Sequence, residues 1–186
     1  MLKKITLTFF FLLSLIKPLY ASIEDKIINN LIKTENLTFS FKQTIGEKTE
    51  KGNCTIQYPK KIFCSYNNRN NKIMVSNGKS LVIKNQRMNS SYIYPLKKTP
   101  LEAILDKKYL VNEFKKLELR TVNEKYLNFL LVNNNNKINI FFDKKTLNLV
   151  GWQTIDIYQN LVIFFISNVE FNKNIDEKLF KLPQLN

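Results

Sequence analysis

The stretch SIEDKIINNLIKTENLTFSFK, residues 22–42, contains the change of hydrophobic period that decides the fold. Apolar residues in its first half recur at helical spacing: Ile23, Ile27, Ile28, Leu31 and Ile32. Apolar residues in its second half alternate with polar ones: Leu37, Phe39 and Phe41. The stretch therefore predicts an amphipathic helix over residues 23–34, capped by Ser22, that leads directly into a half-buried β-strand.

Downstream of this stretch, the two-residue period recurs almost to the end of the chain. It predicts further strands near residues 54–58, 62–66, 73–75, 81–83, 92–94, 116–122, 126–132, 137–142, 147–157 and 161–170. Asn77-Gly78 lies between two of these strands and is a strong hairpin signal, because both residues tolerate positive φ.

One helix is predicted in the middle of these strands. Thr99, Pro100 and Glu102 occupy the N-cap, N1 and N3 positions of a helix start. The predicted helix ends near Asp106 and carries three apolar residues on one side: Leu101, Ile104 and Leu105.

These elements together predict an α+β fold of about ten antiparallel strands and two or three helices. Strands that run in order favour a meander, and a meander this long curls strongly because strands twist. The concave face of a curled sheet has to be filled, and the amphipathic helices are available for this. We therefore predict an incomplete β-barrel, a strongly curved antiparallel sheet with a helical lid over its concave apolar face.

Residues 1–21 have the features of a cleaved secretory signal peptide. Lys3 and Lys4 precede an apolar run from Ile5 to Ile16, and a small residue, Ala21, stands at the predicted cleavage site. The alternative is an uncleaved anchor, but the run is short for a bilayer, which needs about 20 residues. We expect residues 22–186 to form a single domain that is exported to the periplasm.

The composition narrows the function classes. The net charge is +14, and the predicted leader contributes three of these charges. Such a charge favours an anionic membrane surface or an acidic protein, while export argues against nucleic acid. An equally acceptable explanation of the positive charge is that biased base composition enriches lysine, and that the charge only keeps the protein soluble.

We expect no enzymatic activity, cofactor or metal. The chain has no histidine, the commonest general base and metal ligand, and only two cysteines. Its acidic residues are scattered without a recognisable spacing. The abundant aromatic and aliphatic residues fit either an ordinary core or an apolar cavity between sheet and helices.

The two cysteines lie symmetrically about Pro59. In a hairpin centred there, Cys54 and Cys64 face each other, with Cα atoms about 4.5–5.5 Å apart. An exported protein meets an oxidising compartment, so we predict a disulfide; two buried free thiols are the alternative.

Seven motifs in order resemble the outer-membrane lipoprotein carrier proteins, the LolA-type periplasmic chaperones of Gram-negative bacteria. They are Phe39-Ser-Phe41-Lys-Gln43, Gly52 with Tyr58-Pro59-Lys60, Val75-Ser-Asn-Gly78-Lys79-Ser-Leu81, Tyr94-Pro95-Leu96, Thr99-Pro100-Leu101, Leu149-Val-Gly151-Trp152-Gln153, and Leu179-Phe180-Lys-Leu-Pro183. The match covers essentially all of residues 22–183.

The resemblance implies a carrier with a movable lid. Such carriers take triacylated lipoproteins from an inner-membrane lipoprotein-releasing ABC transporter and deliver them to an outer-membrane lipoprotein acceptor, and we expect a monomer. One departure is Tyr58, where the family often has an arginine that ties the lid closed. Lys60 and Lys61 are the candidates to replace it.

The predicted acyl-chain contacts come from the lid helix and the sheet: Leu101, Ile104, Leu105, Phe39, Phe41 and Leu81. Trp152 belongs either to the cavity wall or to the core. Two other functions are alternatives, a periplasmic lipid or lipoprotein sensor that regulates a membrane partner and an enzyme acting on envelope lipids or glycans.

Overall fold

The computed structural model describes residues 21–133, 136–156 and 159–184. The predicted signal peptide, apart from Ala21, lies outside these residues. The strands are β1 (Asn36–Ile45), β2 (Lys48–Gln57), β3 (Lys61–Tyr66), β4 (Lys72–Asn77), β5 (Ser80–Asn85), β6 (Ser90–Pro95), β7 (Arg120–Val122), β8 (Tyr126–Asn133), β9 (Asn136–Asp143), β10 (Leu149–Ile155) and β11 (Leu161–Phe171). The helices are α2 (Ile23–Lys33), η2 (Leu96–Lys98), α3 (Leu101–Leu105), α4 (Lys107–Phe114) and η3 (Glu177–Phe180).

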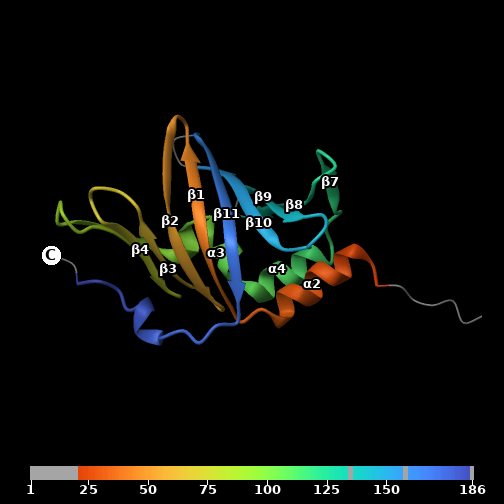
Figure 1. The fold of residues 1–186 in the computed structure, drawn as a ribbon, viewed down its shortest axis with the longest axis horizontal. Coiled ribbons are helices and arrows are strands. Elements are labelled where there is room, and N and C mark those ends of the chain that lie inside the picture. Colours follow the sequence, from red (N-terminus) through yellow and green to blue (C-terminus); the bar gives the residue numbers. More distant parts are fainter. Residues whose placement is uncertain (1–20, 134–135, 157–158, 185–186) are drawn as a thin grey trace, which may run out of the picture.

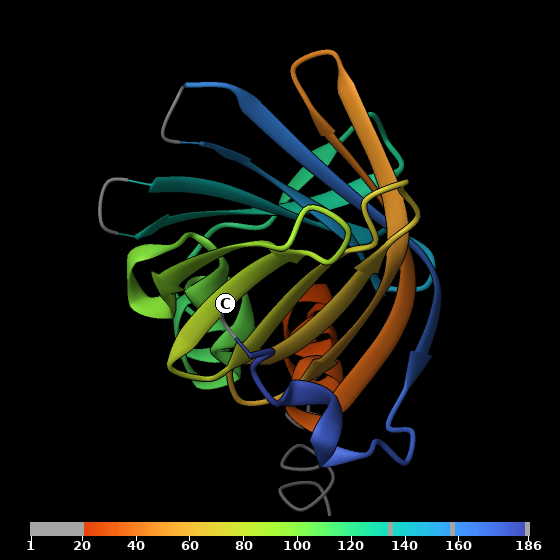
Figure 2. The same ribbon diagram turned by 90° about the vertical axis from the view of Figure 1, so that its left-hand side faces the viewer.

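The eleven strands form one sheet in the order β6-β5-β4-β3-β2-β1-β11-β10-β9-β8-β7. The sheet curls strongly without closing, and the helices α2, α3 and α4 lie inside the curl (Figures 1 and 2). The predicted α+β class and the incomplete barrel with a helical lid are confirmed.

The strands do not form a single meander, as we predicted from their order. β1 pairs with β11 as well as with β2, so the first and last strands meet in the middle of the sheet. β6 and β7, which are consecutive strands, therefore lie at opposite edges. The segment between them carries η2, α3 and α4 across the concave face. These helices therefore form the lid and also make the crossover connection between the two edges of the sheet.

The core lies between the sheet and these helices. The strands β1 to β3 and β8 to β11 turn residues of one face toward the helices, among them Phe39 and Phe41 of β1 and Phe129 of β8. The facing helices contribute a smaller buried set: Ile27, Ile28, Ala103, Ile104, Leu105, Leu110 and Phe114. The helix predicted over residues 23–34 is confirmed as α2, with Ser22 and Asp25 forming a capping box.

The central helix differs from the prediction in two ways. Thr99 does not cap it; the Thr99 hydroxyl donates to the Leu96 carbonyl instead, and Pro100 occupies the N-cap position. The helix also does not end the helical segment at Asp106. Asp106 accepts a hydrogen bond from the backbone N–H of Tyr109 and so caps a further helix, α4, which was not predicted from the sequence.

The C-terminal segment runs along the convex face. Phe180 of η3 is buried there, and Lys61 of β3 pairs with Glu177. The ammonium of Lys84 on β5 donates to the Gln184 carbonyl. Across the described parts of the chain, the structure contains no helix with the length and apolar character needed to cross a membrane.

Candidate functional site

The concave face carries a continuous row of aromatic rings across its middle strands. The rings of Phe41 and Phe164 stack with centroids 4.8 Å apart, and Phe164 stacks on Trp152 at 4.3 Å. Tyr66 meets the edge of Phe41 at 5.0 Å. Trp152, which the sequence left open between cavity wall and core, is buried within the core cluster.

A second aromatic cluster fills the other half of the curl. Phe114, the last residue of α4, stacks on Phe129 with centroids 4.2 Å apart, and both rings meet Phe142 edge-on. Phe114 and Phe129 are fully buried. The Phe114 ring at the C-terminus of α4 therefore fills this half of the concavity.

The structure brings all six predicted acyl-chain contacts to this concave core. Ile104, Leu105, Phe39, Phe41 and Leu81 are buried within it, and Leu101 is half-buried against it. Their role as contacts for a ligand is taken up as a proposal below.

Sequence reasoning missed the contribution of α4. Leu110 and Phe114 are both buried and stand four residues apart, which is a helical spacing. Asp106, an N-cap residue type, precedes them. These two signals together indicate a helix over this segment.

Lys60 ties the lid to the sheet. Its ammonium lies 3.0 Å from Glu102 Oε1 of α3 and 3.1 Å from Asp106 Oδ2 at the start of α4. The Lys60 N–H also donates to the Leu105 carbonyl at 2.9 Å. The hydrogen bonds to Glu102 and then Asp106 raise the pKa of Lys60, so the ammonium stays charged at neutral pH. Lys61, the other lysine predicted as a replacement for the family's arginine, pairs with Glu177 on the convex face instead.

Tyr58 contacts the lid through its ring, which faces the Lys107 ammonium of α4. It is buried, burial raises the pKa of its hydroxyl, and its peptide bond to Pro59 is cis. Beside it, the Lys107 ammonium of α4 donates to the Ile32 and Thr34 carbonyls at the end of α2, and lies 5.6 Å from the Tyr58 ring centroid. The lid is thus held by two lysines, one from the β2–β3 turn and one from α4 itself.

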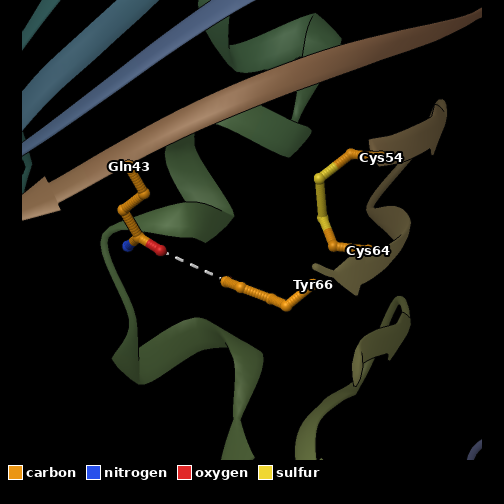
Figure 3. Close-up of a disulfide and its surroundings, with 4 residues drawn as sticks. All are labelled: Gln43, Cys54, Cys64 and Tyr66. Atoms are coloured by element: carbon orange, nitrogen blue, oxygen red, sulfur yellow. Dashed lines mark hydrogen bonds between the residues drawn. A yellow bond between two sulfur atoms is a disulfide. The ribbon is translucent and has the colours of Figure 1, made fainter. Parts of the chain in front are cut away.

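Cys54 and Cys64 form a disulfide in the wall of the concavity. They are paired residues of β2 and β3, their Cα atoms are 4.1 Å apart, and both are buried (Figure 3). Tyr66, two residues after Cys64, donates its hydroxyl to Gln43 Oε1 at 3.3 Å. The disulfide therefore joins neighbouring strands directly beneath the aromatic row.

Beyond the apolar row, the concave face becomes polar. Glu50 pairs with Lys72, whose ammonium lies 3.7 Å from the Tyr66 ring centroid, and Glu50 also accepts from Asn68. Burial acts to raise the pKa of Glu50, but the hydrogen bond and charge of Lys72 outweigh it, so the Glu50 pKa lies below its usual value. This pair marks the polar limit of the concave core.

The side chains of the concavity can bind apolar groups and offer little for bond-making chemistry. The core set is almost entirely aliphatic and aromatic. Among the described residues, no three histidine, cysteine, aspartate or glutamate side chains come together to hold a metal ion. What this arrangement does is exclude water from a large apolar surface that helices cover.

Comparison with protein families gives one match. The model of the family described as "Outer membrane lipoprotein carrier protein LolA" matches residues 32–183. No curated protein sequence is significantly similar to the chain.

Solved structures share the fold at very low sequence identity. An uncharacterized conserved protein from Thermus thermophilus has a TM-score of 0.51 at 8% identity, covering 87% of this chain and 93% of that one. A LolA superfamily protein from Nitrosomonas europaea has a TM-score of 0.45 at 5% identity, covering 87% and 99%. A putative outer membrane lipoprotein-sorting protein domain from Vibrio parahaemolyticus has a TM-score of 0.45 at 9% identity, covering 86% and 97%. The first similarity supports the fold, and the two lower scores add nothing to it.

Proposed function

Because this chain belongs to the outer membrane lipoprotein carrier family LolA, we propose that it is a periplasmic carrier for the acyl chains of lipoproteins. In this proposal residues 1–21 direct export and are removed. The carrier receives triacylated lipoproteins released from the inner membrane by an ABC transporter and hands them to an outer-membrane acceptor. It acts as a monomer and makes or breaks no bond.

The observation that carries the proposal is the apolar concavity covered by helices. Its wall is a continuous aromatic and aliphatic surface, and its cover is attached mainly by side-chain packing and by the contacts of Lys60 and Lys107. Acyl chains could replace the lid side chains at little cost, since one apolar surface would exchange for another. Exposing the chains to water would cost about 0.8 kcal/mol for each CH₂ group.

In this account, Leu101, Ile104 and Leu105 leave the sheet with α3 and then contact the chains from the lid side. Phe39, Phe41 and Leu81 contact them from the sheet. Lys60 takes the place of the family's arginine as the residue that holds the lid, since its two carboxylate partners lie on α3 and α4.

Trp152 provides a direct test, because it is the only tryptophan and lies on the concave face. A triacylated peptide with brominated acyl chains should quench Trp152 fluorescence, since bromine quenches at contact range. The same peptide without acyl chains should leave it unchanged. For a control, the variant Trp152→Phe with Ile93→Trp moves the probe to the convex face of edge strand β6, where quenching should be absent.

Equal binding of acylated and unacylated peptide, or quenching only of the convex probe, would contradict the proposal. In cells, depletion of the protein should leave outer-membrane lipoproteins in the inner membrane, and normal sorting after depletion would reject the delivery role. This second measurement separates carriage from mere lipid binding.

A further inference from the structure

The convex face of β10 and β11 carries an exposed apolar patch that no described part of the chain covers. The convex patch consists of Ile155, Leu161, Ile163 and Phe165, each between 36% and 47% exposed. Ile155 is paired with Leu161, and the residues at 161, 163 and 165 alternate with buried ones. Their side chains therefore share the outer face, opposite to the helices.

A hollow of about 300 Å³ adjoins the patch. Phe165 is paired with Gly151, and Gly151 is paired in turn with Phe141 of β9. The hollow is lined by Gly151, both phenylalanines and Ile163. The patch is thus deepened beside Ile163 and Phe165 and offers an apolar group more than a flat contact.

The pairing of Phe165, Gly151 and Phe141 is part of a row of residues that runs across the strands of the sheet. Cations lie at both ends of this cross-strand row. Lys42 of β1 is paired with Phe165, and Lys51 of β2 is paired with Lys42. On the far side, Phe141 is paired with Asn128 of β8, and Asn128 is paired with Arg120 of β7. Lys42, Lys51 and Arg120 are exposed, and within the described ranges none of them makes an ion pair.

We propose that this convex patch docks the protein on an anionic lipid bilayer. The apolar side chains enter the headgroup region, and the three cations face the phosphates around it. The convex curvature presents the patch outward, so a planar surface can reach it. The net charge, +14 for the whole chain and +11 without the three lysines of the leader, favours the same partner. This surface is separate from the concave core and does not rest on the proposed acyl-chain binding.

A second copy of the chain is a poorer occupant. Packing two convex patches face to face would surround one contact with two sets of Lys42, Lys51 and Arg120. Like charges brought together without partners are unfavourable, and their desolvation adds to the cost. A membrane with anionic headgroups supplies the opposite charge instead.

The test is co-sedimentation of the processed chain, starting at Ser22, with lipid vesicles. We expect binding to vesicles of phosphatidylcholine mixed with phosphatidylglycerol, weaker binding to pure phosphatidylcholine, and weakening by salt. Lys42→Gln and Lys51→Gln should each weaken binding about 5-fold, the equivalent of about 1 kcal/mol for a cation near an anionic surface. Phe165→Ser should weaken it about 10-fold through lost apolar burial.

The matched control uses Tyr92→Ser and Ile93→Ser on edge strand β6, which are exposed by 54% and 50% and lie outside the patch. These variants should bind like the unaltered chain. Absence of binding to the phosphatidylglycerol vesicles would overturn the proposal, as would equal losses from the β6 variants. A dimer that Phe165→Ser dissolves, without vesicle binding, would show that a second copy covers the patch. Quenching of Trp152 by brominated lipopeptide is measured without vesicles, so failure of either proposal leaves the other testable.

Discussion

Lys60, in the turn between β2 and β3, and Glu102 of the lid are joined by an ion pair of 3.0 Å, although they stand 42 residues apart in the chain. Asp106 completes the contact at 3.1 Å from the same ammonium. One side chain of the β2–β3 turn therefore holds both the first turn of α3 and the N-cap of α4. The two carboxylates belong to the short segment that would have to move if the concave core were to open.

Replacing Lys60 should loosen the lid without unfolding the protein. Lys60→Met keeps much of the side-chain length and removes the charge, while the backbone bond from residue 60 to Leu105 remains. A partly exposed ion pair contributes about 0.2–1 kcal/mol, so amide exchange in α3 should accelerate by up to about 5-fold. Lys61→Met, which removes the convex pair with Glu177, should leave α3 exchange unchanged. Equal exchange of α3 in both variants would contradict the role given to Lys60.

Removal of the disulfide should lower the free energy of unfolding. Cys54 and Cys64 close a loop with a sequence separation of 10. Closing a loop of this length restricts the unfolded chain and is worth about 2–3 kcal/mol. Urea denaturation of the oxidised protein, and of the variant with Cys54→Ala and Cys64→Ala, should show this difference. An intact mass with two alkylated thiols before any reduction would instead show that the bond is absent in solution.

The Glu50–Lys72 pair should make stability depend on acid pH. The pKa of Glu50 is lowered in the folded protein relative to its ordinary value of 4.5, so its stabilising effect is present above that value. The effect is lost as the pH falls through the lower folded-state pKa. Glu50→Gln should cost about 1–2 kcal/mol at neutral pH, and the gap to the unaltered chain should shrink below about pH 4.5.

Denaturation curves at a series of pH values measure this gap. Glu118→Gln is the control, because Glu118 is exposed and has no ion pair within the described residues. It should show no comparable gap at any pH. A Glu50→Gln gap that stays constant down to pH 3, a value chosen to lie about one unit below ordinary carboxyl pKa values, would contradict the prediction.

Gly151→Ala should be more damaging than the same change at Gly46. Gly151 has φ +147°, and an added Cβ would lie 2.1 Å from the Phe164 carbonyl oxygen. Gly46, at φ +55°, has no heavy atom within 4 Å of such a Cβ. Gly46→Ala should cost about 1 kcal/mol for the left-handed backbone, while Gly151→Ala should cost about 1–3 kcal/mol more. Thermal unfolding of both variants checks the order, and an equal loss would show that the β10–β11 backbone can shift freely.

The sequence predicted the local elements best where one period persists. The helix over residues 23–34 and the strand that contains Phe39 and Phe41 both follow from spacing alone, and the structure confirms them as α2 and β1. The prediction failed for α4, where Leu110 and Phe114 give only one helical interval. It also failed at Thr99, whose hydroxyl donates to the Leu96 carbonyl and does not accept from an N–H of the helix that follows.

By itself, the sequence determined which residues share a face, because strand side chains alternate and helical ones recur every three or four positions. Phe39 and Phe41 had to lie together, and so did Ile163 and Phe165. Only the tertiary structure decided which face turns inward, because the curl of the sheet and the pairing of β1 with β11 depend on contacts between distant strands. It placed Phe41 against Phe164 in the core and left Phe165 outside beside Lys42. It also decided that Lys60, rather than Lys61, meets the lid, since only the crossover through α3 brings Glu102 and Asp106 within reach.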